Sequence, residues 1–328
     1  MSKQHIFSRD EGPFWPFLVV YAAAAAWYLL LPGQLHLGTA VLIMIALALS
    51  IDLVLGFGGI NTLGQAALYG AGAYGAGFFC VYAGVSEPIS GVFIGALAGA
   101  GVALVTGLIV LRGDHLTVLA LSIVVAGVLH ELANSFQSLT GGFDGLRGID
   151  MAPLLGLFKF DLWGRTGFIY SAIVLFVMHF FMWRLVASPF GVMMRGIREN
   201  PARMDAIGVP VFARRLAIYG IGGAMAGIAG ALQTQTSEFV SMEVLSFQLS
   251  ATALTVVIMG GLGRIYGAFV GAIIYLIFQD YMAKLAPQYW YFWLGLLFLV
   301  VAIFMRRGIV EMGRVALRTL FAKREPGQ

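Results

Sequence analysis

The chain alternates between long apolar stretches and short polar segments. About ten stretches are near the roughly 20 residues that an α-helix needs to cross a bilayer. They lie at about residues 14–31, 37–55, 63–83, 88–111, 116–133, 167–187, 211–233, 245–262, 266–286 and 290–305. The pattern predicts an all-α polytopic membrane protein with about ten transmembrane helices. Because residues 63–83 are rich in glycine and small side chains, we expect that segment to be broken or re-entrant.

Basic residues gather in alternate loops. With the N-terminus in the cytoplasm, the external Lys and Arg residues are Arg147, Lys159, Arg165 and Lys284, and the rest of the 20 lie inside. This asymmetry follows the positive-inside rule and places both termini in the cytoplasm. The expected parts are a cytoplasmic segment at 1–13, a transmembrane domain at 14–306 and a basic cytoplasmic tail at 307–328. Within the domain, 134–166 is an external loop and 188–215 a cytoplasmic one.

Composition agrees with this class. Of 328 residues, 60% are hydrophobic and 11% are charged, whereas a soluble domain carries about 25% charged residues. The net charge of +4 sits in membrane-flanking loops, so it does not indicate a nucleic-acid partner; the expected contact surface is membrane lipid. A single cysteine, Cys80, leaves no disulfide framework or thiolate metal site within the chain.

The cytoplasmic loop at 188–215 is the most charged internal segment, and it contains a short helix with both ends marked. Asn200 is a good N-cap, Pro201 suits the first helical position, and Gly208 can adopt the left-handed conformation that ends a helix. We interpret this helix as a docking element for a cytoplasmic partner. The alternative is a lipid-facing loop whose arginines only fix topology.

Polar uncharged residues cluster near the start of the third stretch. Asn61, Gln65 and Tyr69 recur every four residues, so a helix would place them on one face, and Tyr74 follows. Such a stripe beside small residues can line a pathway for a small polar solute. Hydrogen bonding between helices explains it equally well.

Ionisable groups are scarce within the stretches. We expect Asp52 and Asp280 to be helix-end residues that contact headgroups or water. A charge near the bilayer centre costs about 3 kcal/mol or more, and proton-coupled pumps usually accept that cost for a relay. The scarcity of such groups argues against an ion-coupled carrier.

Several familiar catalytic and nucleotide-binding motifs are missing. None of the four lysines follows a glycine, so no P-loop can be written. The sequence has no G-x-S-x-G elbow, and its five histidines are scattered. We therefore predict no catalytic residue, no metal site and no ATP site on this chain.

Glycines recur every four residues in three places: Gly91, Gly95 and Gly99; Gly223 and Gly227; and Gly267 and Gly271. This spacing lets helix backbones approach closely in lipid. Packing within one subunit is the favoured reading, and a subunit interface is the alternative for some pairs.

Five ordered stretches together resemble one family, the LivM-like permease subunits of branched-chain amino acid ABC importers. They are VLGFGGINTLGQAALYGAGAY, RGDHLTVLAL, LTGGFDGLRGI, FGVMMRGIRENPARMDAIGV and MGGLGRIYGAFVG. The similarity covers about residues 40–310. Arg264 and Ala268 depart from the family pattern, which usually has a small polar residue and a proline there.

The resemblance implies a transport subunit of the bacterial inner membrane, not an enzyme. Its partners would be a LivH-like permease, LivG/LivF-like ATPases that bind ATP and Mg, and a periplasmic substrate-binding protein. The solute would be a branched-chain amino acid, or urea, an amide or an aromatic acid. The residues expected to couple to the ATPases are Arg195, Arg198, Glu199, Pro201, Arg203, Asp205 and Gly208.

Two other functions remain open. An autonomous ion-coupled carrier or channel would have to use Asp52, Glu131 or Asp280 for coupling. A membrane enzyme is more remote, because the acids and histidines do not cluster.

Overall fold

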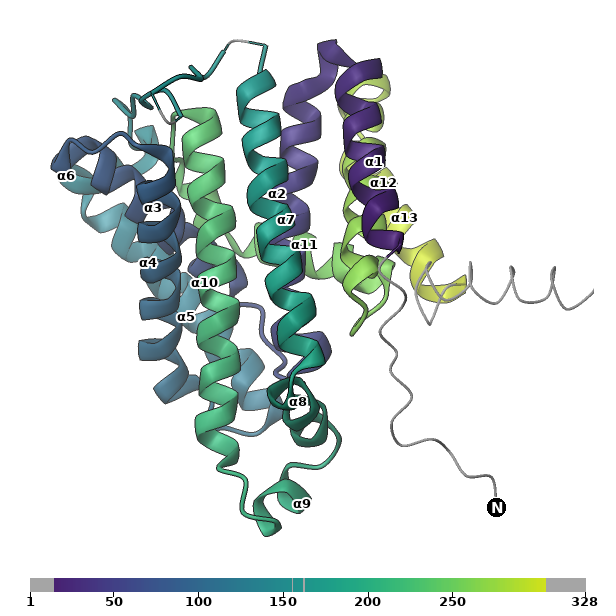
Figure 1. Ribbon diagram of the computed structural model, residues 1–328. Helices are drawn as coiled ribbons and strands as arrows, with labels where there is room; N and C mark the ends of the chain where they lie inside the picture. Colours follow the sequence, from purple (N-terminus) through teal and green to yellow (C-terminus); the bar gives the residue numbers. More distant parts are fainter. Residues whose placement is uncertain (1–14, 155, 162, 305–328) are drawn as a thin grey trace, which may run out of the picture.

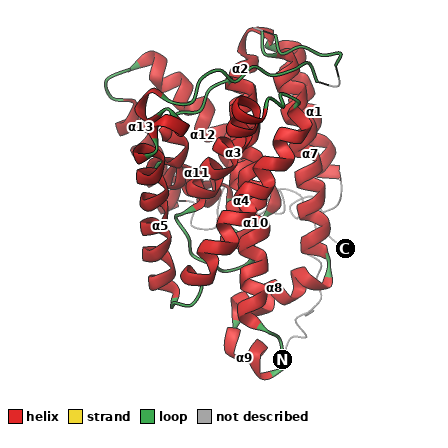
Figure 2. Ribbon diagram, turned by 90° about the vertical axis from the view of Figure 1, so that its left-hand side faces the viewer, coloured by secondary structure: helices red, strands yellow, loops and turns green. Residues whose placement is uncertain are grey.

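A computed structural model describes residues 15–154, 156–161 and 163–304. Helices dominate that part of the chain (Figures 1 and 2). The predicted segments 1–13 and 307–328 lie outside the described residues. The elements are α1 Trp15–Leu30, η1 Pro32–Gln34, α2 Leu35–Ile51, the π-helix η2 Asp52–Phe57, α3 Gln65–Ala83, α4 Pro88–Val110, α5 His115–Ser135, α6 Gln137–Thr140, η3 Gly142–Asp144, α7 Arg165–Ala187, α8 Pro189–Glu199, α9 Pro201–Ala206, α10 Val211–Ser237, η4 Met242–Leu245, α11 Phe247–Gly260, α12 Ile265–Leu285 and α13 Trp290–Phe304.

Each predicted apolar stretch contains a helix, which confirms a helical polytopic membrane protein. Among the described residues, six helices are long and apolar enough to cross a bilayer unaided. Shorter apolar helices lie at Val20–Leu30, Phe247–Gly260 and Trp290–Val301. The number of ten crossings and the cytoplasmic placement of both termini remain predictions.

The long helices run roughly along one direction, and α8 and α9 lie together beyond one end of the bundle (Figures 1 and 2). The loop between α6 and α7 lies at the opposite end (Figure 1). The helix α10 extends from the α8–α9 end toward that loop (Figure 1). We call these two ends the α8–α9 end and the loop end.

The centre of the bundle is a seam of glycines between α3, α4 and α10. A Cβ atom added to Gly99 would lie 2.9 Å from the Cα of Gly227, and one added to Gly95 would lie 2.9 Å from the carbonyl oxygen of Gly227. The backbones are therefore too close for a side chain. This confirms packing within one subunit for the Gly91–Gly99 and Gly223–Gly227 spacings.

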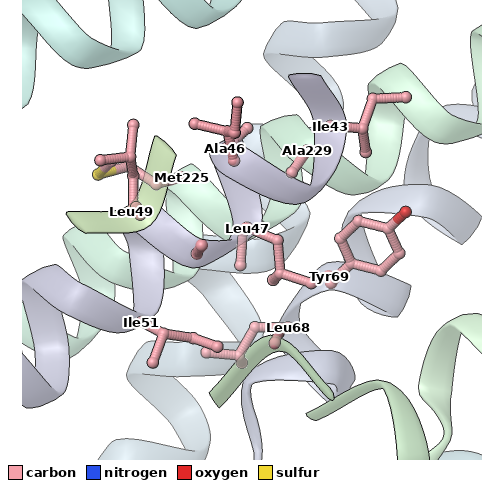
Figure 3. Packing of buried hydrophobic residues seen from close by; sticks show 14 of the residues in the cluster. Ile43, Ala46, Leu47, Leu49, Ile51, Leu68, Tyr69, Met225 and Ala229 are labelled. Carbon is pink, nitrogen blue, oxygen red and sulfur yellow. The ribbon is translucent and has the colours of Figure 1, made fainter. Parts of the chain in front are cut away.

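Buried aliphatic side chains of α2 pack beside this seam. Ile43, Leu47 and Leu49 are at most 4% exposed, and they lie against residues of α3 and α10 (Figure 3). Because α2 carries such residues on nearly all sides, it is enclosed by other helices.

The third stretch is not broken within its helix, and whether it is re-entrant remains a prediction. The helix α3 runs without interruption from Gln65 to Ala83. The break lies instead before α11, where Glu238–Ser246 forms only the short turn η4 and no long helix. Small residues at 63–83 serve close packing, since Gly72 faces Gly227 and Gly70 faces Leu245.

Candidate functional site

The cytoplasmic loop predicted from charge contains two helices, and the sequence analysis found only the second. Ser188 caps the first, α8, by accepting a hydrogen bond from the backbone N–H of Gly191 at 3.4 Å. Met194 and Ile197 of α8 are buried against the bundle. Apolar residues three positions apart between arginines are the amphipathic signal that could have revealed this helix.

The second helix, α9, begins and ends as predicted. The side chain of Asn200 accepts a hydrogen bond from the backbone N–H of Arg203 at 2.9 Å. Gly208 has a φ of 85°, a left-handed conformation that opposes a Cβ. The N–H of Gly208 donates to Asp205 and the N–H of Val209 donates to Met204, which closes the helix.

The chain at α9 projects from the bundle and offers a mixed surface. Pro201, Arg203, Asp205 and Gly208 are exposed. Ile207, at the tip of this loop, is 69% exposed. Charged groups around one exposed aliphatic side chain suit docking to a protein partner.

The predicted coupling residues divide into two groups. Arg198 lies at the end of α8 and turns back onto the bundle, where its guanidinium donates a hydrogen bond to the carbonyl oxygen of Gly56. Arg195 is partly buried on α8, and Glu199 is exposed at its end. The α9 residues instead face away from the bundle.

The contact of Arg198 belongs to a larger junction of three segments. The carboxylate of Asp52 accepts a hydrogen bond from the backbone N–H of Gly263 at 2.7 Å. Arg198 interacts electrostatically with that carboxylate. A Cβ atom at Gly59 would lie 3.0 Å from the Cβ of Arg198, so glycine is required for this approach. The junction joins the end of α2 that continues into η2, the α11–α12 turn and α8.

Asp52 is therefore not a residue in contact with headgroups or water, and that expectation is wrong. Asp52 is fully buried, and it accepts a hydrogen bond from Gly263, 211 residues later in the chain. Asp280 does lie at the surface, where Lys284 pairs with it at 2.6 Å.

The predicted stripe of Asn61, Gln65 and Tyr69 does not lie on one helix face. Asn61 precedes α3, because the helix begins only at Gln65. Gln65 is buried and donates a hydrogen bond to the hydroxyl of Ser50 at 3.3 Å. Tyr69 and Tyr74 border different cavities.

The cavity beside Tyr69 is the more polar of these two. It has a volume of about 280 Å³ and lies between α2, α3, α10, α11, α12 and α13. Its polar lining includes Tyr69, Gln233, Glu243, Ser246, Gln248 and Tyr275. By contrast, the cavity beside Tyr74 is lined almost entirely by apolar side chains of α3 and α5.

Most of these cavity residues were missed by the sequence reading. They come from separate helices, and Glu243 lies in the break before α11, only a few residues from a predicted span. The polar run around Ser237–Ser246 inside an apolar region was the available signal.

A bundle of apolar helices with a polar cavity, and an exposed helical loop at one end, defines a multi-pass membrane permease. The chain belongs to the family described as "Branched-chain amino acid transport system / permease component", whose model matches residues 34–302. This confirms the resemblance to LivM-like permeases.

Individual relatives agree with the family. The high-affinity branched-chain amino acid transport system permease protein LivM of Escherichia coli is 28% identical over 92% of this chain and 76% of its own length. LivM of Salmonella typhimurium is 27% identical over the same shares. The ribose import permease protein RbsC of Bacillus subtilis is 26% identical over 73% of this chain and 80% of its own length. No solved structure matches.

Proposed function

We propose that this chain is one permease subunit of an ABC importer in the bacterial inner membrane. It forms half of a translocation pathway for a branched-chain amino acid or a related small polar solute. ATP and Mg bind to partner ATPases, whose hydrolysis drives the transport. The described part of the chain has no group of metal-binding side chains.

The observation that carries the proposal is the position of α9. It is an exposed, capped helix beyond one end of the bundle, and α8 connects it to the buried junction of Asp52, Gly56 and Gly263. A force applied to α9 would therefore reach two places in the membrane domain, the end of α2 and the α11–α12 turn. We assign coupling to the ATPases to Arg195, Arg198, Glu199, Pro201, Arg203, Asp205 and Gly208.

The partners follow from the family. A LivH-like second permease completes the pathway, LivG/LivF-like subunits dock on α9, and a periplasmic binding protein delivers solute to the loop end. With α9 in the cytoplasm, the segment 134–166 is external and both termini are cytoplasmic. We retain Gln65 and Tyr69 in the pathway, and assign Asn61 and Tyr74 to its surroundings.

Purification of this chain from its native membrane in mild detergent tests the proposal. We expect a second permease and ATP-binding subunits to copurify, and the reconstituted complex to take up solute only with ATP. Uptake by the purified chain alone, driven by an ion gradient, would establish the rival carrier.

A further inference from the structure

A groove between α1 and α7 faces outward from the bundle. It has a volume of about 470 Å³, and the described residues that line it all belong to these two helices. The helices lie side by side on the outside of the bundle (Figures 1 and 2). The described lining is apolar apart from the hydroxyls of Tyr21 and Tyr28. The transport function proposed above does not use this surface.

Small side chains form the hollow part of this groove. Residues 22–26 of α1 are all alanine, and Ala24 and Ala25 line the groove together with Ala172 of α7. Small residues usually let two membrane helices approach closely. Here they line a hollow instead, so another feature must hold the two helices apart.

Two pairs of aromatic rings bridge the helices at either end of the groove. The ring centroids of Tyr21 and Phe176 are 5.1 Å apart, and those of Tyr28 and Phe168 are 6.1 Å apart. These large rings keep the backbones separated over the alanines that lie between them. Because an empty hollow forfeits dispersion contacts on both of its walls, a hollow that faces the membrane favours an apolar occupant.

The length of the groove matches one leaflet of a bilayer. Its walls, residues 21–29 and 168–176, each rise about 12 Å at about 1.5 Å per residue. Half of a hydrocarbon core about 30 Å thick is about 15 Å. Both walls lie toward the loop end, because α1 ends at Leu30 and α7 begins at Arg165. The groove therefore lies at the depth of the acyl chains in the leaflet at the loop end.

A transmembrane helix of a partner protein is too wide to enter the groove. The helices α1 and α7 contact each other, and the axes of helices in contact lie about 8–10 Å apart. A helix with its side chains is about 10–12 Å across. The occupant that fits the space between α1 and α7 is a slim, flexible hydrocarbon chain.

A cation lies at the loop end of the groove. Arg165 is the first residue of α7, and its side chain is exposed. It precedes Phe168 and Ile169 by three and four positions, so it lies on the same helix face, one turn closer to the loop end. No described carboxylate forms an ion pair with it. The acid nearest in sequence, Asp161, instead accepts a hydrogen bond from the backbone N–H of Thr166 at 3.2 Å.

Tryptophans mark the membrane interface at the level of Arg165. Trp163, two residues earlier, is 68% exposed. On α1, the indole N–H of Trp27 donates a hydrogen bond to the carbonyl oxygen of Gln34 at 3.4 Å, just beyond the end of the helix. Tryptophan is enriched at the level of the lipid headgroups. Arg165 therefore lies where lipid phosphates lie, and the groove leads from it into the hydrocarbon.

We propose that the groove binds one acyl chain of an anionic phospholipid, whose phosphate pairs with Arg165. The chain lies on the alanines, and Leu29 and Ile173, which are 75% and 55% exposed, flank its open side. The lipid fills the space beside the alanine run and so fastens α1 to α7, the helix that leads into α8. This inference does not depend on the solute that the permease carries.

The test uses the full chain, in the complex that copurifies with it, in vesicles of phosphatidylethanolamine and phosphatidylglycerol. The probes are phosphatidylglycerol and phosphatidylethanolamine that each carry a diazirine on one acyl chain, and peptide mass spectrometry locates the label after illumination. Ala25→Phe fills the groove, whereas Ala23→Phe adds the same ring on an exposed position of α1 outside it. Arg165→Gln removes the cation, and Arg147→Gln removes another exposed cation, from the loop before α7. Recovery and the thermal unfolding midpoint show whether each variant folds.

We expect the phosphatidylglycerol probe to label residues 21–29 and 168–176 about fivefold more than the phosphatidylethanolamine probe does, the effect of one interfacial cation on an anionic lipid. Arg165→Gln should remove this preference, and Arg147→Gln should keep it. Ala25→Phe should lower the labelling of both walls several-fold with either probe, while Ala23→Phe leaves it unchanged.

Two results would overturn the lipid site. Equal labelling by the two probes, or equal labelling of folded Ala25→Phe and Ala23→Phe, would show only the ordinary contact of a membrane-facing surface with bilayer lipid. Walls that neither probe labels in the wild-type complex would show that a partner protein covers the groove. Either result leaves the proposed transport function intact, because the labelling does not measure transport.

Discussion

The guanidinium of Arg198, at the end of α8, donates a hydrogen bond to the backbone carbonyl of Gly56, in the π-helix that ends α2. The two residues are 142 positions apart in the chain. Single π-helical turns inside α-helices occur often at functional sites. The contact places the end of α8 against η2, which follows directly after the buried helix α2.

Replacement of Arg198 by alanine should uncouple the ATPases from the membrane domain. The variant loses a hydrogen bond from a charged donor, a contribution of about 1.5–3 kcal/mol when the groups are well placed. We expect ATP hydrolysis to continue while its stimulation by the loaded binding protein falls several-fold. Arg112→Ala, which removes an exposed arginine from the α4–α5 turn, is the control. Full stimulation in Arg198→Ala would show that the contact only holds the fold.

Substitutions of Asp52 separate its charge from its hydrogen bond. Asp52→Asn keeps an oxygen that can accept from the N–H of Gly263, whereas Asp52→Ala leaves that N–H without its partner. An unsatisfied buried donor costs about 1–3 kcal/mol. We therefore expect Asp52→Ala to lower the thermal unfolding midpoint in detergent more than Asp52→Asn does. Equal midpoints would mean that water replaces the carboxylate.

If Asp52 instead coupled an ion, Asp52→Asn would abolish transport while leaving stability nearly unchanged. An importer driven by ATP should keep most of its uptake in that variant. Uptake and unfolding measured on the same preparation separate the two functions.

The sequence predicted local features well and long-range ones poorly. The ends of α9 were readable because caps depend on Asn200 and Gly208 themselves. The hydrogen bond between Asp52 and Gly263 could not be predicted, because it depends on how distant segments pack. Spacing placed Asn61 and Gln65 on one helix face, but spacing cannot show that the helix begins at Gln65.

Hydropathy likewise cannot show how deep inside the bundle a helix begins. The predicted stretch 245–262 is long enough to span, yet α11 begins inside the bundle and the preceding chain is irregular. The polar cavity arises from that irregular chain and from residues of six helices, so no single segment of the sequence displays it.

The glycine seam offers a matched pair of substitutions in α4. A Cβ at Gly99 would lie 2.9 Å from the Cα of Gly227, so Gly99→Ala must push α4 and α10 apart. Overpacking of this kind typically costs about 1–3 kcal/mol. At Gly101, two residues later, a Cβ meets nothing within 4 Å. We expect Gly101→Ala to be neutral or to stabilise by up to about 1 kcal/mol, as helix propensity predicts.

Thermal unfolding of the two purified variants in the same detergent provides the measurement. A lower midpoint for Gly99→Ala, with no loss for Gly101→Ala, confirms a seam within one subunit. Equal loss in both would place a packing partner at Gly101 in the assembled complex.

Substitutions of Gly208 test whether the left-handed backbone at the end of α9 is needed for docking. At a φ of 85°, a β-branched residue is strained, whereas asparagine tolerates this conformation. No atom lies within 4 Å of an added Cβ, so side-chain clashes do not contribute. We expect Gly208→Val to weaken association with the ATPases several-fold, and Gly208→Asn to keep most of it. Association measured by copurification at increasing dilution distinguishes them, and equal association of both variants would show that the left-handed end of α9 is not needed for docking.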